Sequence, residues 1–136
     1  MTETSFKHDK CSLLITGANG FVGRPLCAEL LARGYMVKAA VRTAGTLPEI
    51  AAVSVVGEID GGTRWAEALN GVDVVIHLAA RVHVMHENAG NPLAEFRRVN
   101  TEGTEHLARS AAANGVRRLG RPAQVGRVLV VRNAQQ

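Results

Sequence analysis

Thr16-Gly17-Ala18-Asn19-Gly20-Phe21-Val22-Gly23 (TGANGFVG) decides the fold expected of this 136-residue chain. It follows a short apolar run at residues 12–16 that is typical of a buried strand. Gly17 permits a tight turn, Gly20 lets backbone approach a pyrophosphate, and Gly23 allows the following helix to pack closely on a sheet. The unpaired N–H groups of that helix would face the phosphates. The stretch therefore predicts a dinucleotide-binding loop, the alternative being a glycine-rich turn that binds nothing.

The chain beyond this stretch alternates between strand and helix patterns. Further strands are expected at residues 35–41, 53–56 and 72–78, and helices at 21–33, 63–69 and 92–114. Thr63 is expected to cap its helix, and Gly34 and Gly115 stand where left-handed helix ends are expected. Alternation at this spacing predicts an α/β fold, a Rossmann-type doubly wound parallel sheet that is incomplete, with about four to five strands.

The chain is expected to divide into three parts, which are a polar N-terminal tail (1–11), the N-terminal part of an NAD(P)-binding Rossmann domain (12–119) and a divergent basic tail (120–136). The net charge is +4, no acidic residue follows Glu105, and eight arginines lie between Arg97 and Arg132. The basic part has no interleaved aromatic residues for base stacking, and the chain has no recognisable DNA-reading module, so we expect no nucleic-acid partner. A solvated face or a disordered end accounts for the charge.

The composition, and the lack of an apolar targeting segment, favour a cytoplasmic protein. The hydrophobic fraction of 46% is ample for a packed core. No apolar run approaches the roughly 18 residues that cross a bilayer, and residues 1–10 lack the apolar stretch of a signal peptide. Cys11 and Cys27 form no CxxC and suit small apolar positions in a reducing compartment. We expect no membrane partner.

Three ordered motifs resemble the extended short-chain dehydrogenase/reductase superfamily. They are TGANGFVG itself, Val75–Ala80 (VIHLAA) and Val99–Thr104 (VNTEGT). The resemblance covers about residues 12–119, and within the superfamily the chain is most similar to bacterial nucleotide-sugar epimerases and 4-keto-reductases. It implies the NAD(P)-binding part of a nucleotide-sugar epimerase, dehydratase or 4-keto-reductase, in which hydride is transferred at C4 of the sugar. Complete relatives would bind a nucleotide sugar as substrate.

The resemblance also implies contacts to the cofactor. Glu58 and Ile59 would border the adenine, and the residues after the fourth strand would line the ribose and nicotinamide. The expected cofactor-binding residues are Gly17, Asn19, Gly20, Phe21, Val22, Gly23, Arg42, Glu58, Ile59, Leu78, Ala79, Ala80 and Asn100.

Arg42 bears on the choice between NAD and NADP. An NAD-binding unit usually offers a carboxylate to the ribose about 20 residues after the glycines. Here the second strand ends in Val41-Arg42-Thr43, and a guanidinium can accept a 2′-phosphate. NADP is modestly favoured, the alternative being an arginine that stacks on adenine or lies in solvent.

Asn100 interrupts an apolar helix face. The residues at spacings of three and four on this face are Leu93, Phe96, Asn100, Gly103, Leu107 and Ala111, and the face should pack on the sheet. A buried amide needs partners. The resemblance implies that Asn100 holds a proton relay behind the catalytic site, and a bond to a neighbouring strand's backbone is the structural alternative.

A metal site is not expected. His83 and His86 form an HxxH near His77, but this pattern is weak without a spaced carboxylate or cysteine. His83 is at most a substrate contact.

The sequence offers no catalytic residue. The family's chemistry requires a Tyr-x-x-x-Lys pair, whereas the only tyrosine is Tyr35 and no lysine follows Lys38. We therefore expect a truncated and inactive chain. The alternatives are a non-enzymatic dinucleotide-binding or redox-sensing module and a degenerate fragment. The fourth strand would form an exposed edge unless residues 128–131 fold beside it, which predicts marginal stability or self-association.

Overall fold

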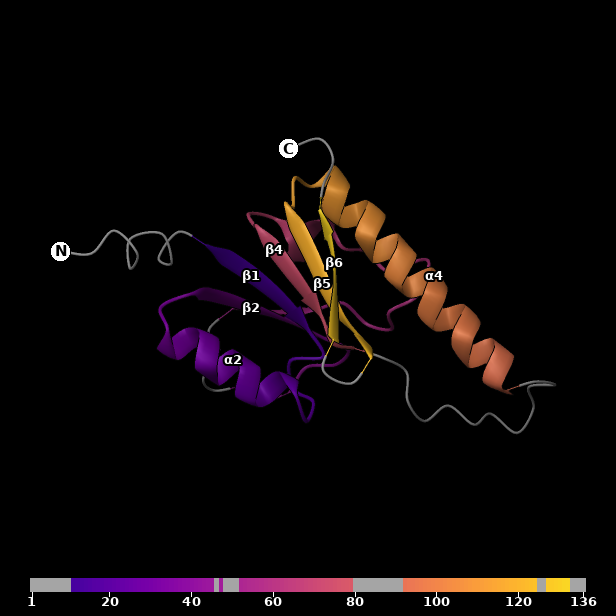
Figure 1. Ribbon diagram of the computed structural model, residues 1–136, viewed down its shortest axis with the longest axis horizontal. Helices are drawn as coiled ribbons and strands as arrows, with labels where there is room; N and C mark the ends of the chain where they lie inside the picture. Colours follow the sequence, from indigo (N-terminus) through magenta and orange to yellow (C-terminus); the bar gives the residue numbers. More distant parts are fainter. Residues whose placement is uncertain (1–10, 46, 48–51, 80–91, 125–126, 133–136) are drawn as a thin grey trace.

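The structure is a computed structural model that describes residues 11–45, 47, 52–79, 92–124 and 127–132. Its elements are β1 (Ser12–Thr16), α2 (Gly23–Ala32), β2 (Met36–Val41), β3 (Ala52–Val55), α3 (Ala66–Leu69), β4 (Val74–His77), α4 (Pro92–Ala113), β5 (Arg118–Gln124) and β6 (Arg127–Arg132). The strands form one sheet in the order β3-β2-β1-β4-β5-β6 (Figure 1). Strands β1 to β5 are parallel, and β6 is antiparallel to β5. The Rossmann-type α/β fold is confirmed; the described residues form six strands where about four to five were expected, and β6 breaks the parallel pattern.

Helices cover both faces of the sheet (Figure 1). Alternate residues of β1 point to opposite faces, so that Leu13 and Ile15 pack in one apolar cluster with Cys27 of α2. Leu14 packs in the other cluster with Leu107 of α4. A strand that is covered on both sides must be apolar throughout, which explains why β1 reads as a continuous apolar run.

The strand order reverses between β1 and β4. From β1 the chain proceeds outward to β2 and β3 on one side, and then returns to β4 and β5 on the other. In doubly wound sheets the ligand crevice lies at the carboxyl ends of the strands at such a reversal, which here are the ends of β1 and β4. The glycine stretch follows β1, so the fold places it at this crevice.

Alpha-helix ends were predicted in part. Gly34 and Gly115 have φ values of 88° and 80°, as expected of left-handed helix stops. Thr63 does not cap α3, because its hydroxyl donates to the carbonyl oxygen of Glu58 at 2.7 Å, and α3 begins later with no side-chain cap. Instead, Lys38 of β2 donates from Nζ to the carbonyl of Ala68 at 3.1 Å and stabilises the carboxyl end of α3.

The carboxyl-terminal part of α4 packs on the sheet as predicted. Gly103, Leu107 and Ala111 are buried. Leu93 is 57% exposed, so its expected place on the buried face is wrong. The reason is that the amino-terminal part of α4 extends past the sheet (Figure 1). Among the described residues, no helix combines the length and apolar character needed to cross a membrane.

The sheet continues beyond residue 119, where the sequence predicted a divergent basic tail. β4 was expected to form an exposed edge unless residues 128–131 paired with it; instead it pairs with β1 and with β5, and so is not an edge. Val128–Val131 pairs with β5, from Val131 opposite Leu119 to Val128 opposite Pro122. The outer strands of the described sheet are β3 and β6. Self-association stays a prediction, with these two edges in place of β4.

Candidate functional site

The turn after β1 is too tightly packed for side chains at its first and last glycines. A Cβ added to Gly17, whose φ is 66°, would lie 2.8 Å from the backbone nitrogen of Ala79. A Cβ added to Gly23 would lie 2.1 Å from the carbonyl oxygen of Gly17. The N–H of Gly20 donates to that same oxygen at 3.0 Å and closes the turn. The two ends of the turn are therefore held together by backbone contacts.

The first turn of α2 is open to an anion. Its cap residue, Val22, contributes no side-chain hydrogen bond, and the first turn contains no acidic residue. Phe21 is 97% exposed and Val22 is 59% exposed, so no apolar core covers the loop within the described residues. Unpaired N–H groups and the positive end of the helix dipole suit a phosphate. The start of α2, with no carboxylate in its first turn and the guanidinium of Arg24 bonded to the carbonyl oxygen of Asn19, fits the diphosphate of a dinucleotide.

Thr16 joins the two strands that border the crevice. Its buried Oγ1 accepts hydrogen bonds from the N–H groups of Leu78 at 3.0 Å and Ala79 at 3.1 Å. Both lone pairs are then used, so the hydroxyl hydrogen is donated to Nδ1 of His77, 2.7 Å away. His77 is thus neutral, with its proton on Nε2. The network holds the residues after β4 against Gly17.

His77 is kept neutral by its surroundings. Burial lowers its pKa from 6.5 to about 4, and the positive charge of Arg121 adds to this shift. The imidazole is 6% exposed and its Nδ1 must stay unprotonated to accept from Thr16. Protonation would therefore cost both desolvation energy and this hydrogen bond.

We expect the stability of the fold to fall as the pH decreases from 6.5 to 4. The unfolded chain takes up a proton on His77 below about 6.5, whereas the folded chain stays neutral to about 4, so the unfolded state binds more protons in this window. The loss approaches about 3 kcal/mol at the acidic end, from roughly 1.4 kcal/mol per pKa unit. Urea titrations at several pH values measure it. His77→Asn, which keeps an acceptor near Nδ1, should flatten the slope, and an unchanged slope would refute the assignment.

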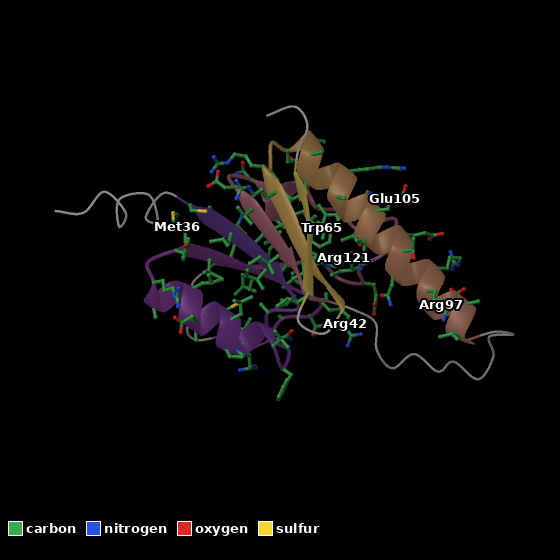
Figure 2. The ribbon with its side chains drawn as sticks, in the orientation of Figure 1. Met36, Arg42, Trp65, Arg97, Glu105 and Arg121 are labelled. Carbon is green, nitrogen blue, oxygen red and sulfur yellow. The ribbon has the colours of Figure 1, made fainter. Side chains whose placement is uncertain are left out.

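Arg42 and Glu58 meet at the carboxyl ends of β2 and β3. Arg42 Nη1 lies 3.4 Å from Glu58 Oε1, and both side chains are exposed, at 69% and 58% (Figure 2 shows Arg42). An exposed pair of this kind is weak, so either partner is free to turn to a ligand. Ile59 is half-buried and packs against the core cluster that includes Leu107 of α4. Its contact with the adenine stays a prediction.

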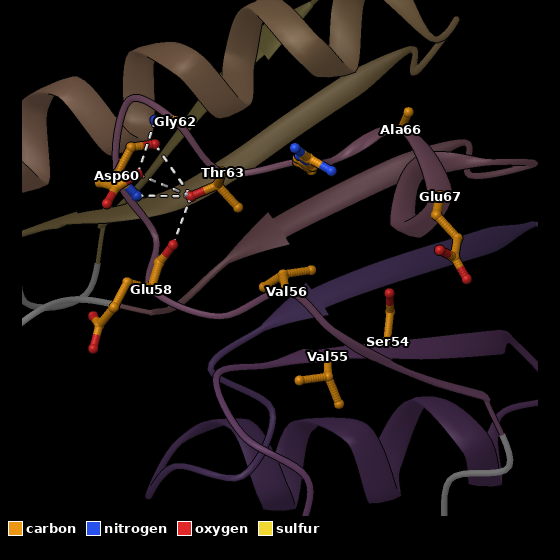
Figure 3. Close-up of a pocket in the computed structure, with 10 residues that line it drawn as sticks. Ser54, Val55, Val56, Glu58, Asp60, Gly62, Thr63, Ala66 and Glu67 are labelled. Atoms are coloured by element: carbon orange, nitrogen blue, oxygen red, sulfur yellow. Dashed lines mark hydrogen bonds between the residues drawn. The ribbon is translucent and has the colours of Figure 1, made fainter.

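A cavity of about 670 Å³ lies between β3 and residues 58–67 (Figure 3). Its lining includes the carboxylates of Glu58, Asp60 and Glu67 and the guanidinium of Arg64. Three carboxylates do not suit a diphosphate, whereas an uncharged base is compatible with them. The cavity thus borders the expected adenine position at Glu58 and is distinct from the glycine turn.

Comparison with known protein families gives a match that includes the glycine turn and β4. The model of the "NAD dependent epimerase/dehydratase family" matches residues 13–121. The chain belongs to this family. A UDP-glucose 4-epimerase of Vibrio cholerae is 43% identical over 113 residues, covering 79% of this chain and 33% of the relative. The chain spans about a third of the length of the curated relatives it matches.

Solved structures agree with the assignment to the epimerase/dehydratase family. A short-chain dehydrogenase/reductase superfamily protein of Agrobacterium tumefaciens, solved with bound NAD, is similar with a TM-score of 0.62 and 32% identity. The alignment covers 79% of this chain and 31% of that protein. MoeE5, solved with UDP-glucuronic acid and NAD, has a TM-score of 0.61 and 29% identity, and the alignment covers 79% and 35% of the two chains.

The structure brings together two pairs of the residues that were predicted from sequence as cofactor contacts. Gly17 contacts Ala79, and Glu58 contacts Arg42. Asn100 is half-buried on α4, and its role stays a prediction. Ala80, His83 and His86 lie outside the described residues. Within the described part of the chain, no group of three His, Cys, Asp or Glu side chains could hold a metal.

Thr16 and His77 were missed as site-forming residues. The sequence did contain a signal for both, because each is a polar side chain at the end of an apolar strand, and a buried polar side chain needs a partner. The sequence alone does not show that the partners are each other, since 61 positions separate them.

Proposed function

We propose that this chain is the NAD(P)-binding part of a nucleotide-sugar epimerase, dehydratase or 4-keto-reductase. The observation that carries the proposal is the turn from Gly17 to Gly23, which has no room for a Cβ at either end and leads to a helix with no side-chain cap and no carboxylate in its first turn. Relatives solved with NAD, and one solved with UDP-glucuronic acid and NAD, support it. The bound dinucleotide would supply hydride exchange at C4 of the sugar.

The residues of this chain would bind and orient the dinucleotide. Backbone N–H groups at the start of α2 would hold the diphosphate, with Asn19 and Gly20 exposed beside it. Leu78 and Ala79, fixed by Thr16, would line the ribose and nicotinamide side. The proposal includes Ala80 and Asn100 in the same contacts.

The proposal also includes inactivity of this chain by itself. A proton donor of the family's type must stand near the nicotinamide, at the carboxyl ends of the strands. Tyr35, the only tyrosine in the sequence, precedes β2 and so lies at the amino ends of the parallel strands, opposite to the carboxyl ends. Cys11 and Cys27 form no disulfide in the described part of the chain, which supports the cytoplasmic location expected from sequence.

Dinucleotide titration tests the proposal. A ligand at 100 times its Kd should raise the free energy of unfolding by about 2.7 kcal/mol. Trp65, the only tryptophan and 2% exposed, reports unfolding through its fluorescence. A melting curve that saturating NAD and NADP both leave unmoved would refute cofactor binding.

We expect tighter binding of NADP than of NAD, through Arg42. Arg42→Ala should weaken NADP binding about tenfold, the value of one charge-assisted hydrogen bond, and leave NAD nearly unchanged. Isothermal titration calorimetry measures both. Arg33→Ala is the matched control, because Arg33 is an exposed arginine paired with Glu29 at the far end of α2. A preference of the parent chain for NAD would contradict this role of Arg42.

A non-enzymatic dinucleotide-binding or redox-sensing module is the second candidate. The position of Tyr35 away from the crevice favours it, since binding would then persist without a proton donor. Assays with UDP-sugars and NAD(P)H separate the two. Turnover by the purified chain would refute both this candidate and the proposed inactivity.

A further inference from the structure

We propose that α4 positions the adenine-binding segment, residues 58–63, through Gly103 and His106, and that the two are positioning residues for cofactor binding. This inference rests on the proposed function, because it assigns a role to residues that do not themselves reach the cofactor. Most residues of the segment 58–63 are exposed, yet hydrogen bonds fix its backbone. Glu58, Asp60, Gly61 and Gly62 are all exposed.

The first contact is the approach of α4 to Ile59. A Cβ added to Gly103 would lie 3.0 Å from the carbonyl oxygen of Ile59 and 3.3 Å from its Cγ2. Gly103 is buried, so the helix backbone itself rests on Ile59. Any larger residue would push the two apart. The position of Ile59, and with it the direction of the adjoining Glu58, is thus set by α4.

The second contact is a hydrogen bond from α4 to Thr63. Nε2 of His106 lies 2.7 Å from the carbonyl oxygen of Thr63, and because a carbonyl only accepts, Nε2 carries the proton and donates. His106 is three residues after Gly103, on the same side of the helix. Both ends of the segment are therefore attached to one face of α4.

Hydrogen bonds within the segment transmit this attachment to Glu58. Thr63 Oγ1 donates to the carbonyl of Glu58 at 2.7 Å and accepts from the N–H of Asp60 at 2.8 Å (Figure 3). Asp60 Oδ1 accepts from the N–H of Gly62 at 2.8 Å. A displacement of Thr63 relative to α4 would consequently move Glu58, which borders the cavity and pairs with Arg42.

The consequence is a mechanical link between the two ends of the proposed site. Asn100 lies one helical turn before Gly103 on α4. The same helix thus carries the asparagine proposed for the nicotinamide side and holds the segment proposed for the adenine side. Adenine binding should therefore depend on α4 contacts, whereas diphosphate binding at the glycine turn should not.

His106→Leu tests this dependence with two probes, adenosine monophosphate and inorganic pyrophosphate. We expect the Kd for adenosine monophosphate to rise about five- to tenfold, as for the loss of one hydrogen bond, with the Kd for pyrophosphate unchanged. His106→Gln, which retains a donor, should bind nearly as the parent chain does. Thr63→Val should weaken the binding of adenosine monophosphate as much as His106→Leu does, and Thr63→Ser should bind it nearly as the parent chain does.

Amide hydrogen exchange provides a readout that does not depend on ligand. The N–H groups of Asp60 and Gly62 should exchange faster in His106→Leu, while those of β1 remain protected. The inference would be overturned if His106→Leu and the parent chain bound adenosine monophosphate with equal affinity. It would also be overturned if His106→Leu lost as much affinity for pyrophosphate as for adenosine monophosphate. Failure of the parent chain to bind NAD, NADP and pyrophosphate would instead overturn the proposed function, and the inference with it.

Discussion

Gly23→Ala is expected to abolish dinucleotide binding. The new methyl carbon would lie 2.1 Å from the carbonyl oxygen of Gly17 and 2.8 Å from Cα of Ala18, and both are backbone atoms that cannot rotate away. The turn must therefore open, which moves the N–H groups at the start of α2 out of register with a diphosphate. We expect the Kd for NAD(P) to rise more than about 100-fold, because several charge-assisted bonds are lost together. The free energy of unfolding should fall by about 3 kcal/mol from overpacking.

Gly45→Ala is the matched control for this change. No atom lies within 4 Å of a Cβ at Gly45, and its backbone is not in the left-handed region. It should bind NAD(P) as the parent chain does. Calorimetry gives the affinities, and urea titration monitored through Trp65 gives the stabilities. Binding by Gly23→Ala at the parent affinity would show that the glycine turn is not the site.

Thr16→Val is expected to destabilise the fold by about 2–4 kcal/mol, since each buried polar group left without a partner costs about 1–3 kcal/mol. Valine keeps the β-branched shape and the volume of threonine, so packing and strand propensity change little. The N–H of Ala79 and Nδ1 of His77 would lose their partner. The N–H of Leu78 would retain the carbonyl of Thr16 at 3.3 Å. The urea midpoint should fall with an unchanged slope.

Thr16→Ser separates the hydroxyl from the methyl group. Serine restores the acceptor for Ala79 and the donor for His77, so most of the stability should return. The pH dependence of Thr16→Val should also change, because Nδ1 of His77 would no longer be occupied. Equal stabilities of Thr16→Val and the parent chain would rule out the proposed hydrogen-bond network.

The sequence predicted those features that depend on neighbouring residues. β1 begins and ends where the apolar run does, at Ser12 and Thr16, because a strand covered on both faces must be apolar throughout. The glycine turn was predicted because its tight backbone excludes side chains, and Gly34 and Gly115 because only glycine easily adopts their φ values. Family membership followed from the same motifs.

Features that depend on distant residues were not predicted. Thr63 has the sequence position of a helix cap, but the carbonyl of Glu58 competes for its hydroxyl. Ile59 packs under α4 because Gly103 leaves space there, which is a tertiary effect. β6 was unexpected as a partner of β5, because β5 had first to extend to Gln124 before Val128–Val131 could pair with it.

The reversed direction of β6 determines where this domain can be tethered. Arg132 pairs with Arg118, which lies opposite Val74 at the entry end of the parallel strands. Ser12, where β1 starts, is at the same end, whereas Gly17 is at the other. A biosensor chip or fusion protein attached after Arg132 or before Ser12 would therefore leave the glycine turn facing solution. A domain immobilised through either terminus can therefore be titrated with nucleotides.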